Sequence, residues 1–193
     1  AWFYRYDRMP GDSDPFTAPR GGFLEASPRV VDAIAADLGS RQPDAVVAFG
    51  GGSAIDTGKA LSVALVEEGS IRDYLEGVGA REPSGRRTPL VAIPTTAGTG
   101  SEATKNAVLS EVGERGFKKS LRHDRFVPDV ALIDPLLQLS CPRELTAASG
   151  LDAITQLLEA YVSTGATPFT DALAIDGLAA AGRSFSRAVE RGE

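Results

Sequence analysis

The sequence predicts an α/β domain followed by the start of an all-helical domain. In the first two thirds of the chain, short apolar runs alternate with helix-like patterns, whereas only helical patterns follow from about Pro142. The opening stretch is rich in Gly, Pro and Asp and has no sustained period. We therefore expect an irregular arm at residues 1–26, an α/β domain at 27–138 and the beginning of a helical domain at 139–193.

Local signals predict the individual elements. Ser27 and Pro28 open a helix, because serine caps helices and proline suits the first helical position, and Gly39 ends it. The apolar run at 45–49 predicts a strand, and a helix to about Val66 follows it. The remaining expected elements are strands at 90–93, 106–110 and 130–133, a surface loop at 76–89, and helices at 142–162 and 168–189.

Composition excludes several classes of partner. Of the 193 residues, 42% are hydrophobic and 24% charged, which is a globular composition, and a net charge of -6 offers no basic face to nucleic acid. No apolar run approaches the roughly 20 residues of a membrane helix, and the first residues lack the layout of a signal peptide. The lone Cys141 fits a reducing compartment. We expect a cytoplasmic protein without nucleic-acid or membrane partners.

Three consecutive glycines, Gly50, Gly51 and Gly52, join the first strand to the next helix. Glycine permits positive φ and lets a ligand approach the backbone closely. We expect Ser53 to cap the helix, with Asp56 three residues later giving a near capping box. The free N–H groups of a helix start favour a phosphate. The alternative is a turn that only connects strand to helix.

Neither of the two common nucleotide-binding motifs fits this turn. A P-loop has four residues between its glycines and a hydroxyl after its lysine, but here five residues intervene and an alanine follows Lys59. The dinucleotide pattern GxGxxG finds its first two glycines in Gly50 and Gly52, but Ile55 takes the third place. The turn therefore keeps the physical features of a phosphate site without either motif.

Hydroxyl groups and glycines fill the segment PTTAGTGSEAT at 94–104, directly after the strand at 90–93. In open α/β sheets, ligands bind outside the carboxyl ends of the strands. This segment is therefore a candidate ligand-binding loop.

On the predicted helix at 142–162, Asp152, Gln156 and Glu159 are spaced i, i+4 and i+7 and share one face. Two oxygen ligands one turn apart can hold a divalent metal. The alternative is an ordinary solvated helix face. The apolar residues form an opposite stripe, which we expect to face the helical core: Leu151, Ile154, Leu158 and Val162.

Four motifs occur in one order: GGGSAIDTGKA, IPTTAGTGSEAT, VPDVALIDP and LTAASGLDAITQLLEAYVS. From about Ser27 to the C-terminus, the chain resembles the iron-containing (group III) alcohol dehydrogenases. The resemblance implies a Rossmann-like, parallel-sheet domain that binds NAD or NADP, in the dehydroquinate-synthase-like architecture. It also implies a helical domain that holds a divalent metal, iron or zinc.

The resemblance further implies two groups of cofactor-binding residues. The pyrophosphate-binding turn and an acidic position next to the cofactor correspond to Gly50, Gly51, Gly52, Ser53 and Asp56. The loop that touches the cofactor and lines the cleft corresponds to Thr95, Thr96, Thr99 and Ser101. No residue is assigned a direct catalytic role.

The metal site departs from the family pattern. Asp152 matches the family's first metal ligand, but Gln156 stands where the family usually has histidine, and an amide oxygen binds a metal more weakly than imidazole does. The other two histidine ligands are expected beyond Glu193, and the first βαβ unit before Ser27. The chain thus resembles the middle half of such an enzyme: an incomplete reading frame, a natural fragment or a deliberate truncation.

These observations lead to two main hypotheses. The first is a metal-dependent oxidoreductase that transfers a hydride between NAD(P) and a small alcohol or aldehyde, as a homo-oligomer. The alternative is a non-catalytic, truncated cofactor-binding or structural fragment, because two possible metal ligands are fewer than the three of a usual catalytic site. A third reading, an enzyme of the dehydroquinate-synthase type, is disfavoured by the TTAGTGSE loop.

Overall fold

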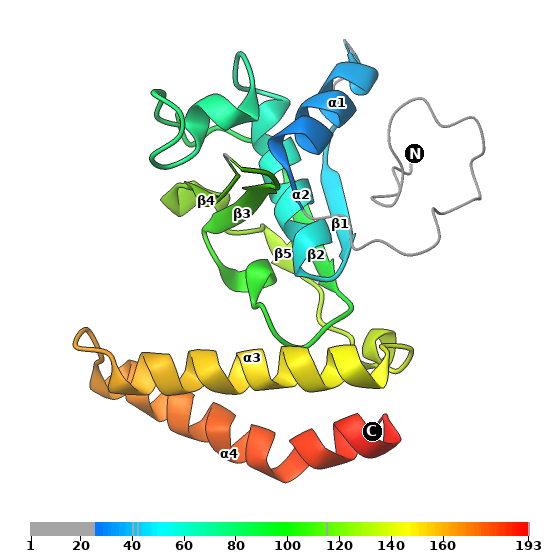
Figure 1. The fold of residues 1–193 in the computed structure, drawn as a ribbon, viewed down its shortest axis with the longest axis vertical. Helices are drawn as coiled ribbons and strands as arrows, with labels where there is room; N and C mark the ends of the chain where they lie inside the picture. The colour runs from blue at the N-terminus through cyan, green and yellow to red at the C-terminus, as the bar shows by residue number, and fades with distance from the viewer. Residues whose placement is uncertain (1–25, 40, 42, 115, 193) are drawn as a thin grey trace. The chain divides into compact units, whose positions relative to one another are not determined.

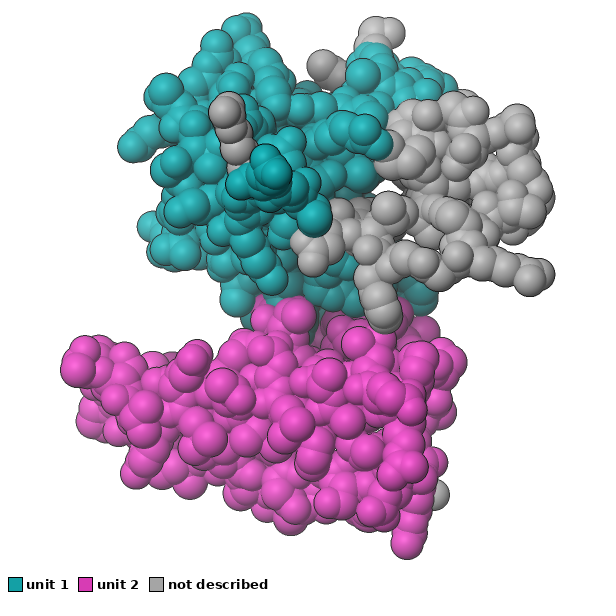
Figure 2. All heavy atoms as spheres, viewed as in Figure 1, with its two compact units in different colours: residues 1–93, 101–132 teal, residues 94–100, 133–193 magenta. Residues whose placement is uncertain are grey.

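The structure, a computed structural model, describes residues 26–39, 41, 43–114 and 116–192. The irregular arm predicted at 1–26 lies outside these residues apart from Ala26. Figure 2 shows two compact units. The first comprises residues up to Ile93 together with Ser101–Leu132, and the second comprises Pro94–Gly100 and the chain from Ile133 onward.

The second unit includes the loop at 94–100, which the sequence patterns group with the α/β part. The two divisions differ because they rest on different criteria. The expected boundary follows the change of sequence pattern near Pro142, whereas the two units are defined by which residues contact one another in space. The division at 27–138 and 139–193 stays a prediction.

The first unit contains the predicted mixture of strands and helices (Figure 1). Its elements are α1 (Pro28–Leu38), β1 (Val46–Gly50), α2 (Gly52–Ala64), β2 (Leu90–Pro94), β3 (Asn106–Glu111), β4 (Phe117–Arg122) and β5 (Val130–Ala131), with short 3-10 helices η1 (Ile71–Tyr74), η2 (Ser101–Ala103) and η3 (Asp124–Phe126). Ser27 caps α1 through its side chain, as predicted. All four predicted strands are present, with boundaries that differ by one or two residues.

A three-stranded sheet has the order β1-β2-β5, and β2 pairs with β5 in parallel. Side chains alternate along β1: Val46 and Ala48 are buried, whereas Val47 and Phe49 are exposed. The buried face packs against α2. The sheet therefore presents one face to this helix and places the end of β1 next to the helix start.

β3 and β4 form a separate antiparallel sheet, with Asn106 opposite Arg122 and Glu111 opposite Phe117. The sequence analysis expects no strand at 117–122, and the structure corrects this. The strand Phe117–Arg122 lacks apolar alternation, and Leu121 is its only fully buried residue. Pairing with β3 rather than a local hydrophobic pattern makes it a strand.

Helix α2 is buried on nearly every side. Ile55 joins a cluster with β1 and β2, whereas Ala60, Leu61 and Val63 join a larger cluster with α1, β3 and β4. A helix enclosed in this way must satisfy its buried polar groups within the protein.

The second unit consists of the 94–100 segment, a short 3-10 helix η4 (Pro135–Gln138), and two long helices, α3 (Arg143–Val162) and α4 (Pro168–Arg191). Gly150 of α3 lies against the Phe185 ring, and Gly177 of α4 lies against Leu157, so the helices run antiparallel. No helix of the described residues is long and apolar enough to cross a membrane.

The predicted core stripe of α3 is largely not buried. Leu151, Leu158 and Val162 are 54%, 47% and 73% exposed, while the contact with α4 uses Gly150 and Leu157. Helical periodicity identifies apolar positions, but the position of the neighbouring helix decides which of them are covered.

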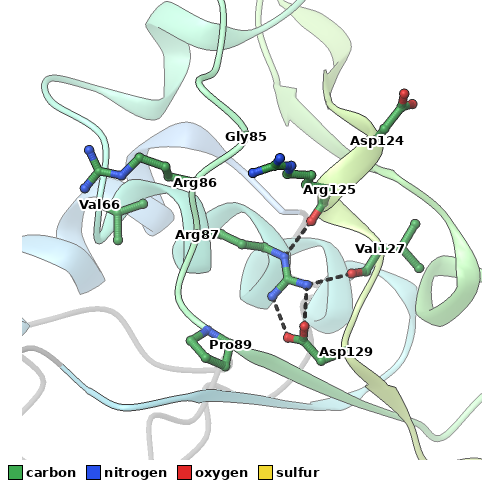
Figure 3. Close-up of a pocket in the computed structure, with 9 residues that line it drawn as sticks. All are labelled: Val66, Gly85, Arg86, Arg87, Pro89, Asp124, Arg125, Val127 and Asp129. Atoms are coloured by element: carbon green, nitrogen blue, oxygen red, sulfur yellow. Dashed lines mark hydrogen bonds and ion pairs between the residues drawn. The ribbon is translucent and has the colours of Figure 1, made fainter.

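Arg87 joins the loop before β2 to the segment before β5 (Figure 3). Its guanidinium donates to the carbonyls of Arg125 (2.7 Å) and Val127 (2.8 Å) and to both carboxylate oxygens of Asp129 (2.6 and 2.9 Å). Asp129 also accepts the backbone N–H of Leu90 at 2.7 Å. This contact aligns β2 with β5. A cavity of about 730 Å³ opens beside Arg87, and none of the predicted site residues line it.

Gly58 sets the distance between α2 and β1. A Cβ at this position would lie 2.5 Å from the Ala48 Cβ, and this neighbour is a strand residue that cannot rotate away. We expect Gly58→Ala to lower the free energy of unfolding by about 1–3 kcal/mol, as overpacking does. Gly182→Ala is the control: nothing lies within 4 Å of its Cβ position, so a gain of about 0.5–1 kcal/mol is expected. Urea unfolding measures both, and equal stability of Gly58→Ala and wild type would contradict the close approach.

Asp129 should make stability depend on acid pH. The hydrogen bond from Arg87, aided by Leu90, holds the Asp129 pKa below its usual 3.8 against the opposing effect of burial. A carboxyl with a lowered folded pKa stabilises the fold above the unfolded pKa and loses this effect as the pH falls through the folded pKa. Because its side chain is 52% exposed, we expect Asp129→Asn to cost only about 1 kcal/mol at neutral pH.

This difference between Asp129→Asn and wild type should be constant between about pH 5 and 7 and should shrink below about pH 4. Urea unfolding at a series of pH values measures it, with the exposed Asp176→Asn as control. A difference that does not change with pH would show that the ionised carboxylate is not the stabilising form.

Candidate functional site

The glycine turn between β1 and α2 is the first part of the site. Gly50 has φ +146°, and a Cβ there would lie 2.7 Å from the Ala54 Cβ, so this position requires glycine. Gly51 is the N-cap, and no side chain caps the helix. Ser53 is therefore not the cap that the sequence predicts: the helix begins at Gly52, and Ser53 is exposed within its first turn. The predicted capping box with Asp56 does not form, because the carboxylate bonds elsewhere.

The absence of a side-chain cap leaves the start of α2 suited to an anion. The first N–H groups of a helix have no partner within the helix, and at Gly52 and Ser53 no capping oxygen takes that place. Backbone N–H groups and the positive end of the helix dipole then point in one direction. The turn at 50–53 has the local geometry that a phosphate needs.

Asp56 lies one turn into α2, and both of its oxygens are used by the protein. The Ser101 hydroxyl donates to Oδ1, and the Val108 N–H donates to Oδ2 at 3.2 Å. Burial raises the pKa of Asp56, opposed by the two hydrogen bonds and by the charges of Lys59 and Lys118. Asp56 therefore ties α2 to Ser101 and β3, and its predicted place beside a cofactor stays a prediction.

Lys59 is a functional candidate that sequence reasoning considered only as a P-loop lysine. Its side chain is fully buried, and Nζ donates to the carbonyls of Ser101 (2.7 Å), Thr104 (2.8 Å) and Asn106 (2.8 Å). Burial lowers the pKa of Lys59 to about 8, against the opposing charges of Asp56 and Glu102. One feature of the sequence indicates that Lys59 is buried: it lies in TGKALSVAL, where its helix neighbours are small or apolar on all faces.

The hydroxyl-rich loop belongs to the second unit as far as Gly100, and Ser101 belongs to the first. A Cβ at Gly98 would lie 2.8 Å from the Cβ and the carbonyl oxygen of Ser149 on α3, so the loop packs closely on this helix. Thr95 and Thr96 are half-buried, and Thr99 is exposed.

Asp152 and Gln156 lie one turn apart on α3, and both are exposed. The Gln156 amide nitrogen donates to Asp152 Oδ2 at 2.9 Å and to the Gly98 carbonyl at 3.2 Å. The structure therefore joins this pair to the hydroxyl-rich loop of the same unit. No group of three or more His, Cys, Asp or Glu side chains that could hold a metal occurs in the described part of the chain.

The chain matches two parts of one protein family. The family described as "Iron-containing alcohol dehydrogenase" matches residues 23–135, and "Fe-containing alcohol dehydrogenase family, C-terminal" matches residues 146–193. The first match alone covers more than half of the 193 residues.

Curated relatives agree with this assignment. "Long-chain-alcohol dehydrogenase 1" of Geobacillus thermodenitrificans is 44% identical over 149 residues, which are 77% of this chain and 37% of the relative. "NAD-dependent methanol dehydrogenase" of Bacillus methanolicus is 43% identical over 150 residues, which are 78% of this chain and 38% of the relative. The chain thus spans about two fifths of the length of these relatives.

Solved structures share the fold. A sulfoacetaldehyde reductase from Bifidobacterium kashiwanohense in complex with NAD+ aligns with a TM-score of 0.80 at 35% identity, over 86% of this chain and 43% of that one. An iron-containing alcohol dehydrogenase from Thermotoga maritima aligns with a TM-score of 0.77 at 35% identity, over 86% and 44%. The family matches, the relatives and the fold agree, and the chain belongs to the iron-containing alcohol dehydrogenase family.

Proposed function

We propose that this chain carries the nucleotide-binding part and two metal ligands of an NAD(P)-dependent alcohol dehydrogenase acting on small alcohols or aldehydes. The observation that carries the proposal is the uncapped start of α2 behind the Gly50 turn, in a chain of this family. A nicotinamide cofactor supplies the hydride chemistry when bound. We further propose a cytoplasmic homo-oligomer. The family assignment supports this proposal of location and assembly.

The proposed nucleotide site is built on the turn at 50–53. The backbone N–H groups of Gly52 and Ser53 bind the pyrophosphate, and Gly50 and Gly51 leave room for it to approach. Thr95, Thr96, Thr99 and Ser101 supply hydroxyls for further contacts with the cofactor. The Ser101 hydroxyl donates to Asp56 and accepts from the Lys59 ammonium at 3.3 Å, so toward a ligand it can only accept a further hydrogen bond.

The donor set fits part of a divalent metal site. Among the described residues, one carboxylate oxygen of Asp152 and the carbonyl oxygen of the Gln156 amide accept no hydrogen bond. Two oxygens one turn apart suit iron or zinc as part of a larger set, and water, substrate or other protein groups supply the rest. When bound, the metal supplies Lewis acidity toward the alcohol or carbonyl oxygen. Asp152 and Gln156 orient each other through their hydrogen bond and hold these oxygens in place.

Replacement of Gly51 should separate a phosphate site from a purely structural turn. Its φ of -73° is open to any residue, so Gly51→Val places a side chain at the turn without backbone strain. We expect the Kd for NADH and NADPH, measured by nicotinamide fluorescence, to rise at least about tenfold, because binding there depends on close backbone approach. Ala36→Val, on the exposed side of α1, is the control. If folded Gly51→Val binds NADH and NADPH as tightly as wild type, the turn serves only to connect strand and helix, and the proposed phosphate site is wrong.

Position 156 tests the metal ligands. Imidazole binds iron and zinc more tightly than an amide oxygen, so Gln156→His should lower the Kd for Zn²⁺ at least about tenfold. Asp152→Ala should abolish stoichiometric metal binding and leave nucleotide affinity within about twofold, because its carboxylate lies outside the glycine turn. Calorimetry and metal analysis after dialysis measure both. Metal binding that is indifferent to both substitutions would place the metal elsewhere.

A chimera tests the activity itself. This chain's matching segment replaces the corresponding 149 residues of the Geobacillus enzyme, and NAD(P)H oxidation is followed with short- and long-chain aldehydes in the presence of Fe²⁺ or Zn²⁺. Turnover that Asp152→Ala removes is expected. Folded, nucleotide-binding chimeras without turnover for any aldehyde would favour the non-catalytic alternative.

A further inference from the structure

Lys59 connects α2 to one continuous segment of chain, residues 101–106. Its three carbonyl acceptors are Ser101 and Thr104, at and just after η2, and Asn106, the first residue of β3. An ammonium has three hydrogens, and these three bonds use all of them. The segment therefore wraps around the buried charge and has its position fixed by it.

Asp56 holds the same segment from one turn earlier on α2. It accepts the Ser101 hydroxyl at the beginning of the segment and the Val108 N–H just beyond its end. Residues three apart on a helix lie on one face, so Asp56 and Lys59 act side by side. Ser101 is thereby bound twice, through its hydroxyl by Asp56 and through its carbonyl by Lys59.

The hydrogen bonds of Asp56 and Lys59 link two parts of the proposed nucleotide site, namely the helix that follows the glycine turn and Ser101. α2 begins at the glycine turn, and Ser101 is the residue at which the 94–100 loop rejoins the first unit. A buried charge is expensive for a fold, and an apolar side chain in its place could fill the core without fixing any loop. The free-energy cost of burying the Lys59 charge therefore indicates that the lysine is retained because it fixes the position of residues 101–106.

We propose that Lys59 is a positioning residue for nucleotide binding: its ammonium fixes Ser101 and the segment to Asn106 against the helix that carries the glycine turn. This rests on the proposed nucleotide site. Lys59 touches neither cofactor nor substrate. It acts by holding Ser101 in the arrangement that a nucleotide requires, and so reduces the ordering that binding would otherwise cost.

Titration of Lys59 gives this role a pH signature. The groups that face it are Asp56 on α2 and Glu102 on η2, and Lys118 on β4 faces Asp56 in turn. Below the folded pKa of about 8 the ammonium donates three hydrogen bonds, and above it a neutral amine has only two hydrogens. One carbonyl then loses its donor, so nucleotide affinity should fall as the pH rises through about 8.

Stability should change with the opposite sign. The folded pKa of about 8 is below the model value of 10.5, so between these values the unfolded chain binds the extra proton. The Lys59 contribution to the free energy of unfolding therefore increases as the pH rises across this window. A residue that served only stability would not make NADH binding weaker where the fold becomes more stable.

The experiment compares wild type, Lys59→Met and Lys105→Met. Met keeps the length of the side chain without its charge, and the exposed Lys105, paired with Asp124, is the matched control in the same segment. We expect Lys59→Met to raise the NADH Kd at least about tenfold at pH 7 and Lys105→Met to leave it within about twofold. The wild-type Kd should rise about threefold between pH 7 and 9, and that of Lys59→Met should not. A folded Lys59→Met with wild-type affinity overturns the proposal.

Two further measurements keep the outcome decisive. If Lys59→Met does not fold, Lys59→Leu is measured in its place, and a folded Lys59→Leu with wild-type NADH affinity overturns the proposal. Amide hydrogen exchange without nucleotide should be faster at 101–106 in folded Lys59→Met and in wild type at pH 9, after correction for intrinsic rates. Unchanged exchange overturns the positioning role itself. A different outcome is faster exchange at 101–106 in Lys59→Met while wild type binds neither NADH nor NADPH. In that case the proposed nucleotide site is wrong, and Lys59 has no role in nucleotide binding.

Discussion

The enclosure of α2 is the constraint on which the rest of the first unit depends. Beyond its first turn, a helix packed by β1 on one side and by α1 and β3 on others has little solvent-facing surface for polar groups. Each polar residue must be bonded internally or be absent. Glycine at position 58 allows the sheet to approach, and Lys59 and Asp56 bind a loop segment on another face. One helix thus fixes the sheet and the neighbouring loop.

This enclosure has a consequence for ligand binding. Because α2 is held along its length, its first turn presents backbone N–H groups from a rigid base, and a glycine N-cap leaves them without a side-chain partner. Rigid support for a small number of exposed donors is what an anion site requires. Asp56 is part of that support, since both of its oxygens are bonded to protein groups.

The helical unit is held differently. Its two long helices meet through glycines that receive large side chains, Gly150 with Phe185 and Gly177 with Leu157, while many other apolar side chains stay exposed. Apart from Ala174, none of the residues of these helices is fully buried. Burial of apolar surface stabilises a fold by about 25 cal/mol per Å², so the surface that these side chains leave exposed contributes nothing to stability. The Asp152–Gln156 pair is held by the loop contact through Gly98 and not by a surrounding core.

The sequence by itself determined the order of the helices and of the strands other than β4, the Ser27 cap, the glycine turn and the family. These follow from short-range patterns: apolar runs, capping residues and motifs of contiguous letters. Tertiary structure decided the rest. β4 is a strand because β3 pairs with it, α2 starts at Gly52 and not behind a Ser53 cap, and Leu151, Leu158 and Val162 of the predicted α3 stripe stay exposed. The burial of Lys59 is of the same kind. Its three acceptors lie more than 40 residues away, and a local pattern carries no information about a partner at that separation.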